Sequence, residues 1–93
     1  MILIITDTVQ NTFAVARDRG WPVVTAARGE FRGQNGERVF GVPTTPDALK
    51  GFAKGTKVVL GPNWARRPDV ATINANFAFG TFVHFDATPA GPS

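Results

Sequence analysis

The segment 61–68 holds the densest group of side chains that could bind a ligand. It contains Asn63, Trp64, Arg66 and Arg67, followed by a proline that is typical of a helix start. Two guanidinium groups beside an indole at a helix N-terminus could hold a phosphate, a carboxylate or a stacked base. Trp and Arg are also enriched at protein–protein hot spots. In the structural alternative, Trp64 packs over a sheet edge and both arginines are solvated. The residue types therefore predict a binding surface but not its ligand.

The glycine-rich segment 28–38 is expected to add Arg28, Phe31 and Arg32 to this surface. The four arginines of the combined set would form a basic rim on a chain of net charge +3. Such a rim attracts anionic partners, so nucleic-acid or nucleotide binding is the alternative to protein binding.

Asp7, His84 and Asp86 are secondary candidates. Asp7 follows the first apolar segment, where a carboxylate can cap a helix or, in other folds, bind Mg²⁺ or act as a nucleophile; the cap is the favoured interpretation. His84 is the only histidine, and Asp86 shares its strand face, so the two could form an acid/base pair. The structural interpretation of His84 is again favoured, and we predict no metal site.

The remaining catalytic and cofactor patterns are missing. The chain has no cysteine, its only serine is Ser93, and neither a phosphate-binding loop nor a dinucleotide-binding glycine pattern follows a predicted strand. We therefore predict a binding protein without a cofactor, and keep an enzyme that uses Asp7, His84 and Asp86 as a further alternative.

Composition predicts one small globular domain. The chain has 93 residues, of which 43% are hydrophobic, enough for a single core. No apolar run approaches the roughly 18 residues of a membrane span, and the first residues lack the features of a secretory signal. We expect a cytoplasmic protein with no membrane association. A basic group of Lys50, Lys54 and Lys57 suits the C-terminal end of a predicted helix and needs no ligand.

Hydrophobic patterning predicts about five strands and about three helices. The apolar runs and the starting and stopping residues place strands at 2–5, 22–26, 39–42, 57–60 and 81–85, and helices after Asp7, after Thr45 and after Pro68. Segment 28–38 is expected to be a loop or a hairpin, with Asn35 and Gly36 in a tight turn. Strand 2–5 is expected to be central and buried on both faces.

This alternation predicts a small α/β three-layer sandwich with a mostly parallel sheet, Rossmann-like or flavodoxin-like. Residues 1–86 would form the domain and residues 87–93 a flexible tail. The sequence does not determine the order of the strands in the sheet. It also leaves open whether the chain forms a homodimer.

The order of three segments resembles that of small α/β proteins of actinobacterial phages. These segments run Ile-Ile-Thr-Asp-Thr-Val-Gln, then Val-Val-Leu-Gly-Pro-Asn-Trp-Ala-Arg-Arg-Pro-Asp, then Thr-Phe-Val-His-Phe-Asp. The resemblance covers the layout of residues 2–86 and carries no assigned active site. It implies an accessory protein that binds a host protein and alters host growth or physiology.

Overall fold

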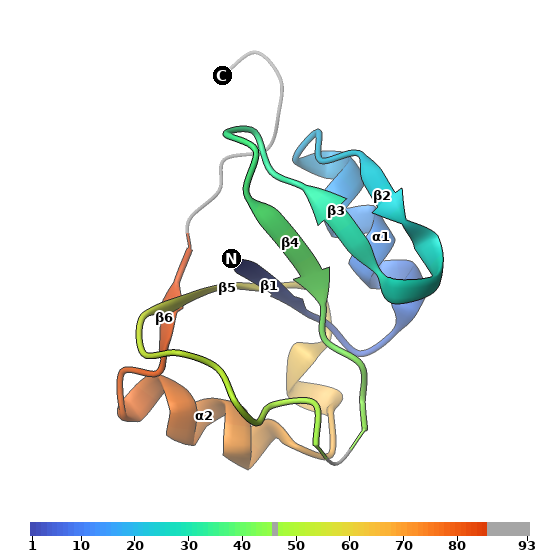
Figure 1. The fold of residues 1–93 in the computed structure, drawn as a ribbon. Helices are drawn as coiled ribbons and strands as arrows, with labels where there is room; N and C mark the ends of the chain where they lie inside the picture. The colour runs from blue at the N-terminus through green and yellow to red at the C-terminus, as the bar shows by residue number, and fades with distance from the viewer. Residues whose placement is uncertain (46, 86–93) are drawn as a thin grey trace.

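The computed structural model describes residues 1–45 and 47–85, with the backbone alone for Arg28 (Figure 1). Two α-helices, two short 3₁₀ helices and six strands follow one another in these residues. Their order is β1 (Ile2–Ile5), α1 (Val9–Asp18), β2 (Val23–Thr25), η1 (Ala26–Arg28), β3 (Glu30–Arg32), β4 (Arg38–Gly41), β5 (Thr56–Leu60), η2 (Trp64–Arg66), α2 (Val70–Ala78) and β6 (Phe82–His84).

The strands form one mixed sheet in the order β2-β3-β4-β1-β5-β6. β1 pairs in parallel with β4 on one side and β5 on the other, and β6 extends the parallel part beside β5. β2, β3 and β4 pair antiparallel at the opposite end. All four residues of β1 are buried, which confirms the prediction of a central strand covered on both faces.

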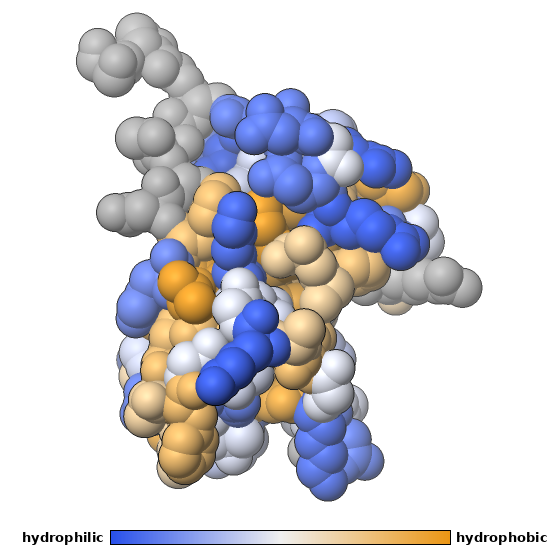
Figure 2. Space-filling view, turned by 60° about the vertical axis from the view of Figure 1, so that its left-hand side comes forward, coloured by the Kyte–Doolittle hydropathy of each residue, from blue (hydrophilic) through white to orange (hydrophobic). Residues whose placement is uncertain are grey.

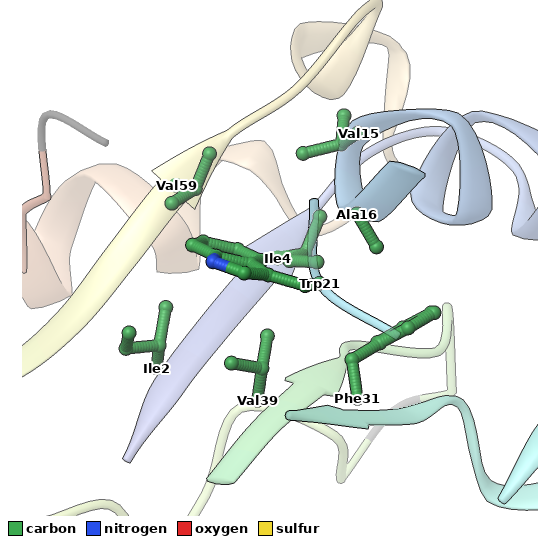
Figure 3. Close-up of a cluster of buried hydrophobic side chains, with 8 residues drawn as sticks. All are labelled: Ile2, Ile4, Val15, Ala16, Trp21, Phe31, Val39 and Val59. Atoms are coloured by element: carbon green, nitrogen blue, oxygen red, sulfur yellow. The ribbon is translucent and has the colours of Figure 1, made fainter. Parts of the chain in front are cut away.

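The two helices cover opposite faces of the sheet. In Figure 1, α1 lies behind β2 and β3, whereas α2 lies at the end of the sheet that carries β6. Because side chains alternate along a strand, Ile2 and Ile4 face α1 while Leu3 and Ile5 face the side of α2. Figure 3 shows the α1 side, where Trp21 lies beside Ile4 within a cluster that also contains Ile2, Val15, Ala16, Phe31, Val39 and Val59.

The predicted fold class is wrong. A three-helix, mostly parallel, five-stranded Rossmann-like sandwich does not fit a six-stranded mixed sheet with two α-helices in the described residues. One cause is the segment 28–38, which contains β3 and a turn back into β4. In this turn Gly33 N–H donates to the Glu37 carbonyl (2.8 Å), and Gly36 has a φ of +80°. Of the two interpretations left open for this segment, a loop or a hairpin, the structure shows the hairpin.

The second cause is that the predicted helix after Thr45 does not form. Residues 47–49 make a turn instead, and Pro46 lies outside the described residues. Gly51 and Gly55 both have a positive φ (+84° and +83°), so fewer than two helical turns fit before the backbone leaves the helical region. Leu49 is buried in the α2-side core. The C-terminal end of a helix therefore does not account for the basic group of Lys50, Lys54 and Lys57.

The helix that was predicted after Pro68 is confirmed as α2, with Ile73 fully buried against the sheet. The helix that was predicted after Asp7 is confirmed as α1, but its N-cap is Thr8. The Thr8 hydroxyl accepts from Asn11 N–H (3.1 Å), and Asp7 instead accepts from the Asn11 side-chain amide (2.6 Å). None of the described helices is long and apolar enough to cross a membrane.

Candidate functional site

Arg67 joins the carboxyl ends of the central strands. Its guanidinium group donates to the carbonyl oxygens of Thr6 (3.0 Å), which follows β1, and of Val42 and Pro43 (both 2.8 Å), which follow β4. The remaining two of its five N–H groups donate to the two carboxylate oxygens of Asp69 (both 2.9 Å). Every donor of the guanidinium is therefore occupied.

The ion pair between Arg67 and Asp69 is shielded from water. The side chain of Arg67 is 0% exposed and that of Asp69 is 21% exposed. Hydrogen bonds from Arg67 hold the pKa of Asp69 below its ordinary value of 3.8, because they stabilise the ionised carboxylate. Asp69 therefore keeps α2 fixed to the edge of the sheet through Arg67.

The residues around Arg67 differ in how exposed they are. Asn63 and Arg66 are exposed, Asn63 with a left-handed φ of 59°. Trp64 is partly buried and packs against the α2-side core. Arg67 itself is buried, so its side chain cannot contribute to a contact surface. From this segment, only Asn63, Arg66 and part of Trp64 remain accessible to a ligand.

The other residues of the predicted surface lie apart from that segment. Phe31 is 0% exposed, so it belongs to the core and not to a surface. Arg32 pairs with Arg38 at the start of β4, and its guanidinium donates to the Gly36 carbonyl (3.2 Å) in the hairpin turn. This is the end of the sheet opposite to Arg66. The backbone of Arg28, in η1, lies at the carboxyl end of β4, as the bond from Gly41 N–H to Gly29 shows. The predicted basic rim is therefore divided.

A small cavity of about 250 Å³ opens at the carboxyl ends of β1 and β4. This is where open parallel sheets usually bind ligands. Asp7 and Thr8 line it from the start of α1, together with Thr12, residues of η1 and residues at the end of β4. The Thr6 and Thr12 hydroxyls are 2.8 Å apart, and both can donate to the Thr8 carbonyl. The cavity thus offers one carboxylate, the hydrogen-bonded hydroxyls of Thr6, Thr8 and Thr12, and the hydroxyl of Thr44.

The secondary candidates do not converge in the described residues. Asp7 lies at this cavity, whereas His84 is exposed on β6 and stacks on Phe77 of α2, with ring centroids 4.2 Å apart. Asp86 lies outside the described residues, so the predicted pair of His84 and Asp86 lies outside them as well. Within 1–45 and 47–85, no group of three or more His, Cys, Asp or Glu side chains could hold a metal ion.

A larger hollow lies next to this cavity, along α1. It is an apolar groove of about 710 Å³ between α1 and β2, which we call the α1–β2 groove. Its lining consists mainly of apolar side chains with Gln10 and Arg17 beside them: Val9, Phe13, Ala14, Ala16, Trp21, Pro22, Val23 and Phe31. Val9 is 70% exposed and Val23 is 50% exposed. Large apolar side chains are therefore in contact with water along a concave surface.

The sequence prediction missed this groove. Val9, Phe13 and Ala16 recur at helical spacing in the sequence, yet the buried residues of α1 are Thr12, Val15 and Ala16. Val9 and Phe13 lie to one side of the buried stripe, and Phe13 contacts Phe31 edge to face at 5.1 Å. The sequence did hold a signal for the groove. The apolar stripe of α1 is wider than a helix of ten residues needs for contact with one core.

The comparisons with known proteins identify no relative. No protein-family model matches the chain, and no curated protein or solved structure matches it either.

Proposed function

We propose that this chain is a non-enzymatic binding module that holds a partner protein in the α1–β2 groove. In keeping with the phage resemblance, the proposed partner is a host protein whose binding alters host growth or physiology, and the proposed location is the host cytoplasm. The observation that carries the proposal is one groove of about 710 Å³ with a mainly apolar lining, in which Val9 and Val23 are exposed. Exposed apolar surface in a concave site is typical of binding sites.

The structure of the groove supports a protein partner. Aromatic side chains form its floor, since Trp21 is 5% exposed and Phe31 is 0% exposed, and partly exposed valines border it. A rigid aromatic floor with accessible apolar side chains around it is the arrangement of an interface centre. Arg66 and Asn63, which the sequence suggested, lie beyond the groove's lining.

Nucleic-acid binding has weaker support. Arg67 is buried, and Arg32 and Arg66 lie at opposite ends of the sheet. Figure 2 shows hydrophilic side chains in several separate groups on the face that it presents, between hydrophobic ones. A continuous basic surface is what an electrostatic nucleic-acid interface requires.

The test is an affinity purification of the tagged chain from an actinobacterial lysate, with and without nuclease. Val23→Lys places a charge in the groove at a position that is 50% exposed, so the variant is expected to fold. Val83→Lys is the matched control, since Val83 is 47% exposed on the other edge strand, outside the groove. We expect one nuclease-resistant protein that the wild type and Val83→Lys retain and Val23→Lys loses.

Two results would contradict the proposal. Retention of only nuclease-sensitive material, which salt releases, would favour nucleic-acid binding. Equal retention by both lysine variants would place the interface elsewhere.

A further inference from the structure

We propose that the α1–β2 groove receives an amphipathic α-helix of the partner, with an acidic side chain next to Arg17. This inference rests on the proposed function, because it names the structural class of the segment that enters the same groove.

One wall of the groove is itself a helix face. Val9, Gln10, Phe13, Ala14 and Arg17 all line the groove, and their spacing places them on one side of α1. By helical spacing, Ala14 lies at the outer border of this wall. A small side chain there lets a second helix approach to the usual interaxial distance of about 8–10 Å.

The sheet beneath the groove is wider than α1. Six strands spaced about 4.8 Å apart span about 24 Å, whereas one helix with its side chains is only about 10 Å wide. Among the described residues, α1 is the α-helix that covers this face of the sheet. The groove runs along the side of α1 that faces β2. A partner helix would cover Val23 of β2 and extend the helical layer.

β2 is poorly suited to receive an extended strand instead. It has three residues, it follows Pro22, and its pairing with β3 shifts register between Val23 and Thr25. Short length, proline and irregular pairing are features that prevent a sheet edge from adding a further strand. The apolar side chains of the groove therefore offer more to a partner than the backbone of β2 does.

The charge of Arg17 favours partner helices that carry an acidic residue. Arg17 lines the groove, is exposed, and makes no ion pair with a described residue. An acidic residue on a partner helix would pair with it, which gives specificity more than affinity. A second copy of the chain is the less favoured occupant, because two copies of net charge +3 repel each other and bring two Arg17 side chains close together.

The experiment uses the whole chain and two displayed peptide libraries. One library holds peptides of about 18 residues in a helix-forming framework, and the other is identical except for a central proline, which breaks the helix. Selected peptides are then titrated against the wild type, Arg17→Glu and Arg66→Glu. Both arginines are exposed, so both variants are expected to fold.

We expect binders from the helix-forming library alone, with apolar residues at helical spacing and an acidic residue beside them. Arg17→Glu should weaken binding by about tenfold, a size consistent with reversing one partly exposed ion pair, while Arg66→Glu leaves it unchanged. Binders only from the proline library would overturn the inference in favour of an extended segment. Equal affinity for both charge variants would overturn the acidic contact.

Two other outcomes separate this inference from the proposed function. If neither library gives a binder although Val23→Lys still abolishes capture from the lysate, the groove binds a partner but not through a helix. If the chain forms a concentration-dependent dimer that Val23→Lys dissociates, a second copy occupies the groove.

Discussion

At the residue scale, the arginine pair of segment 61–68 shows how neighbours in sequence take opposite roles. Arg66 is exposed, whereas Arg67 is buried with all five donors occupied. The sequence predicted a surface role for both, because nothing local distinguishes them. The carbonyl groups that hold Arg67 come from the ends of β1 and β4, so its role depends on the tertiary fold.

Replacing Arg67 by Ala is expected to destabilise the fold by about 3–5 kcal/mol, because it leaves the Asp69 carboxylate and three carbonyl groups without their partner. Arg66→Ala, the exposed neighbour, should change the free energy of unfolding by less than about 0.5 kcal/mol. Urea unfolding at neutral pH measures both. Equal effects of the two substitutions would show that the buried network does not support the fold.

The same ion pair predicts a pH dependence. Since the pKa of Asp69 is lowered in the folded state, its contribution to stability is present above its ordinary pKa of 3.8 and is lost as the pH falls through the folded pKa. Asp69→Asn should therefore be less stable than the wild type at neutral pH, with a difference that shrinks at about pH 3. Urea unfolding at both pH values measures this difference. The control Asp47→Asn alters an exposed pair with Lys50 and should change little. A difference that stays constant with pH would show that the Asp69 pKa is not lowered.

At the scale of elements, the sequence predicts what local pattern determines. The continuous apolar run of β1 and the apolar spacing of α2 placed both elements correctly. The helix predicted after Thr45 does not form, because Gly51 has a positive φ and lies inside the predicted helix, before a second turn is complete. β3 was not predicted as a strand. Its three residues, between Gly29 and Gly33, are too few for an alternation of apolar and polar side chains to distinguish a strand from a loop.

Contact between α1 and the sheet depends on a glycine. A Cβ on Gly41 of β4 would lie 2.5 Å from Cγ2 of Thr12 in α1, so Gly41→Ala is expected to destabilise by about 1–3 kcal/mol through overpacking. Thr12→Ser removes that methyl group, and the next nearest Thr12 atoms are 3.6 Å and 3.7 Å away. The double variant should therefore lose much less than the sum of the single losses. Thermal unfolding of the four proteins measures the coupling, and strictly additive losses would exclude this contact as the cause.

At the scale of the whole molecule, two neighbouring hollows beside α1 could bind, and Val9 and Phe13 line both. The carboxyl end of β1 and β4 has the location of a ligand site, but Arg67 fills the space between the strand ends and the cavity beside it is small. The α1–β2 groove is larger and mainly apolar. Since the groove is built from α1, Trp21 and β2–β3, its existence depends on the antiparallel end of the sheet, which the predicted Rossmann-like layout lacked.

Hydrogen–deuterium exchange of the chain, alone and with the protein that it retains from the lysate, tests the groove most directly. Bound partner should slow exchange in residues 9–17 and 21–24, which contain the groove's accessible side chains, and leave residues 61–66 unchanged. Slowed exchange confined to residues 61–66, with residues 9–17 and 21–24 unaffected, would contradict the account and return the interface to the carboxyl end of the sheet.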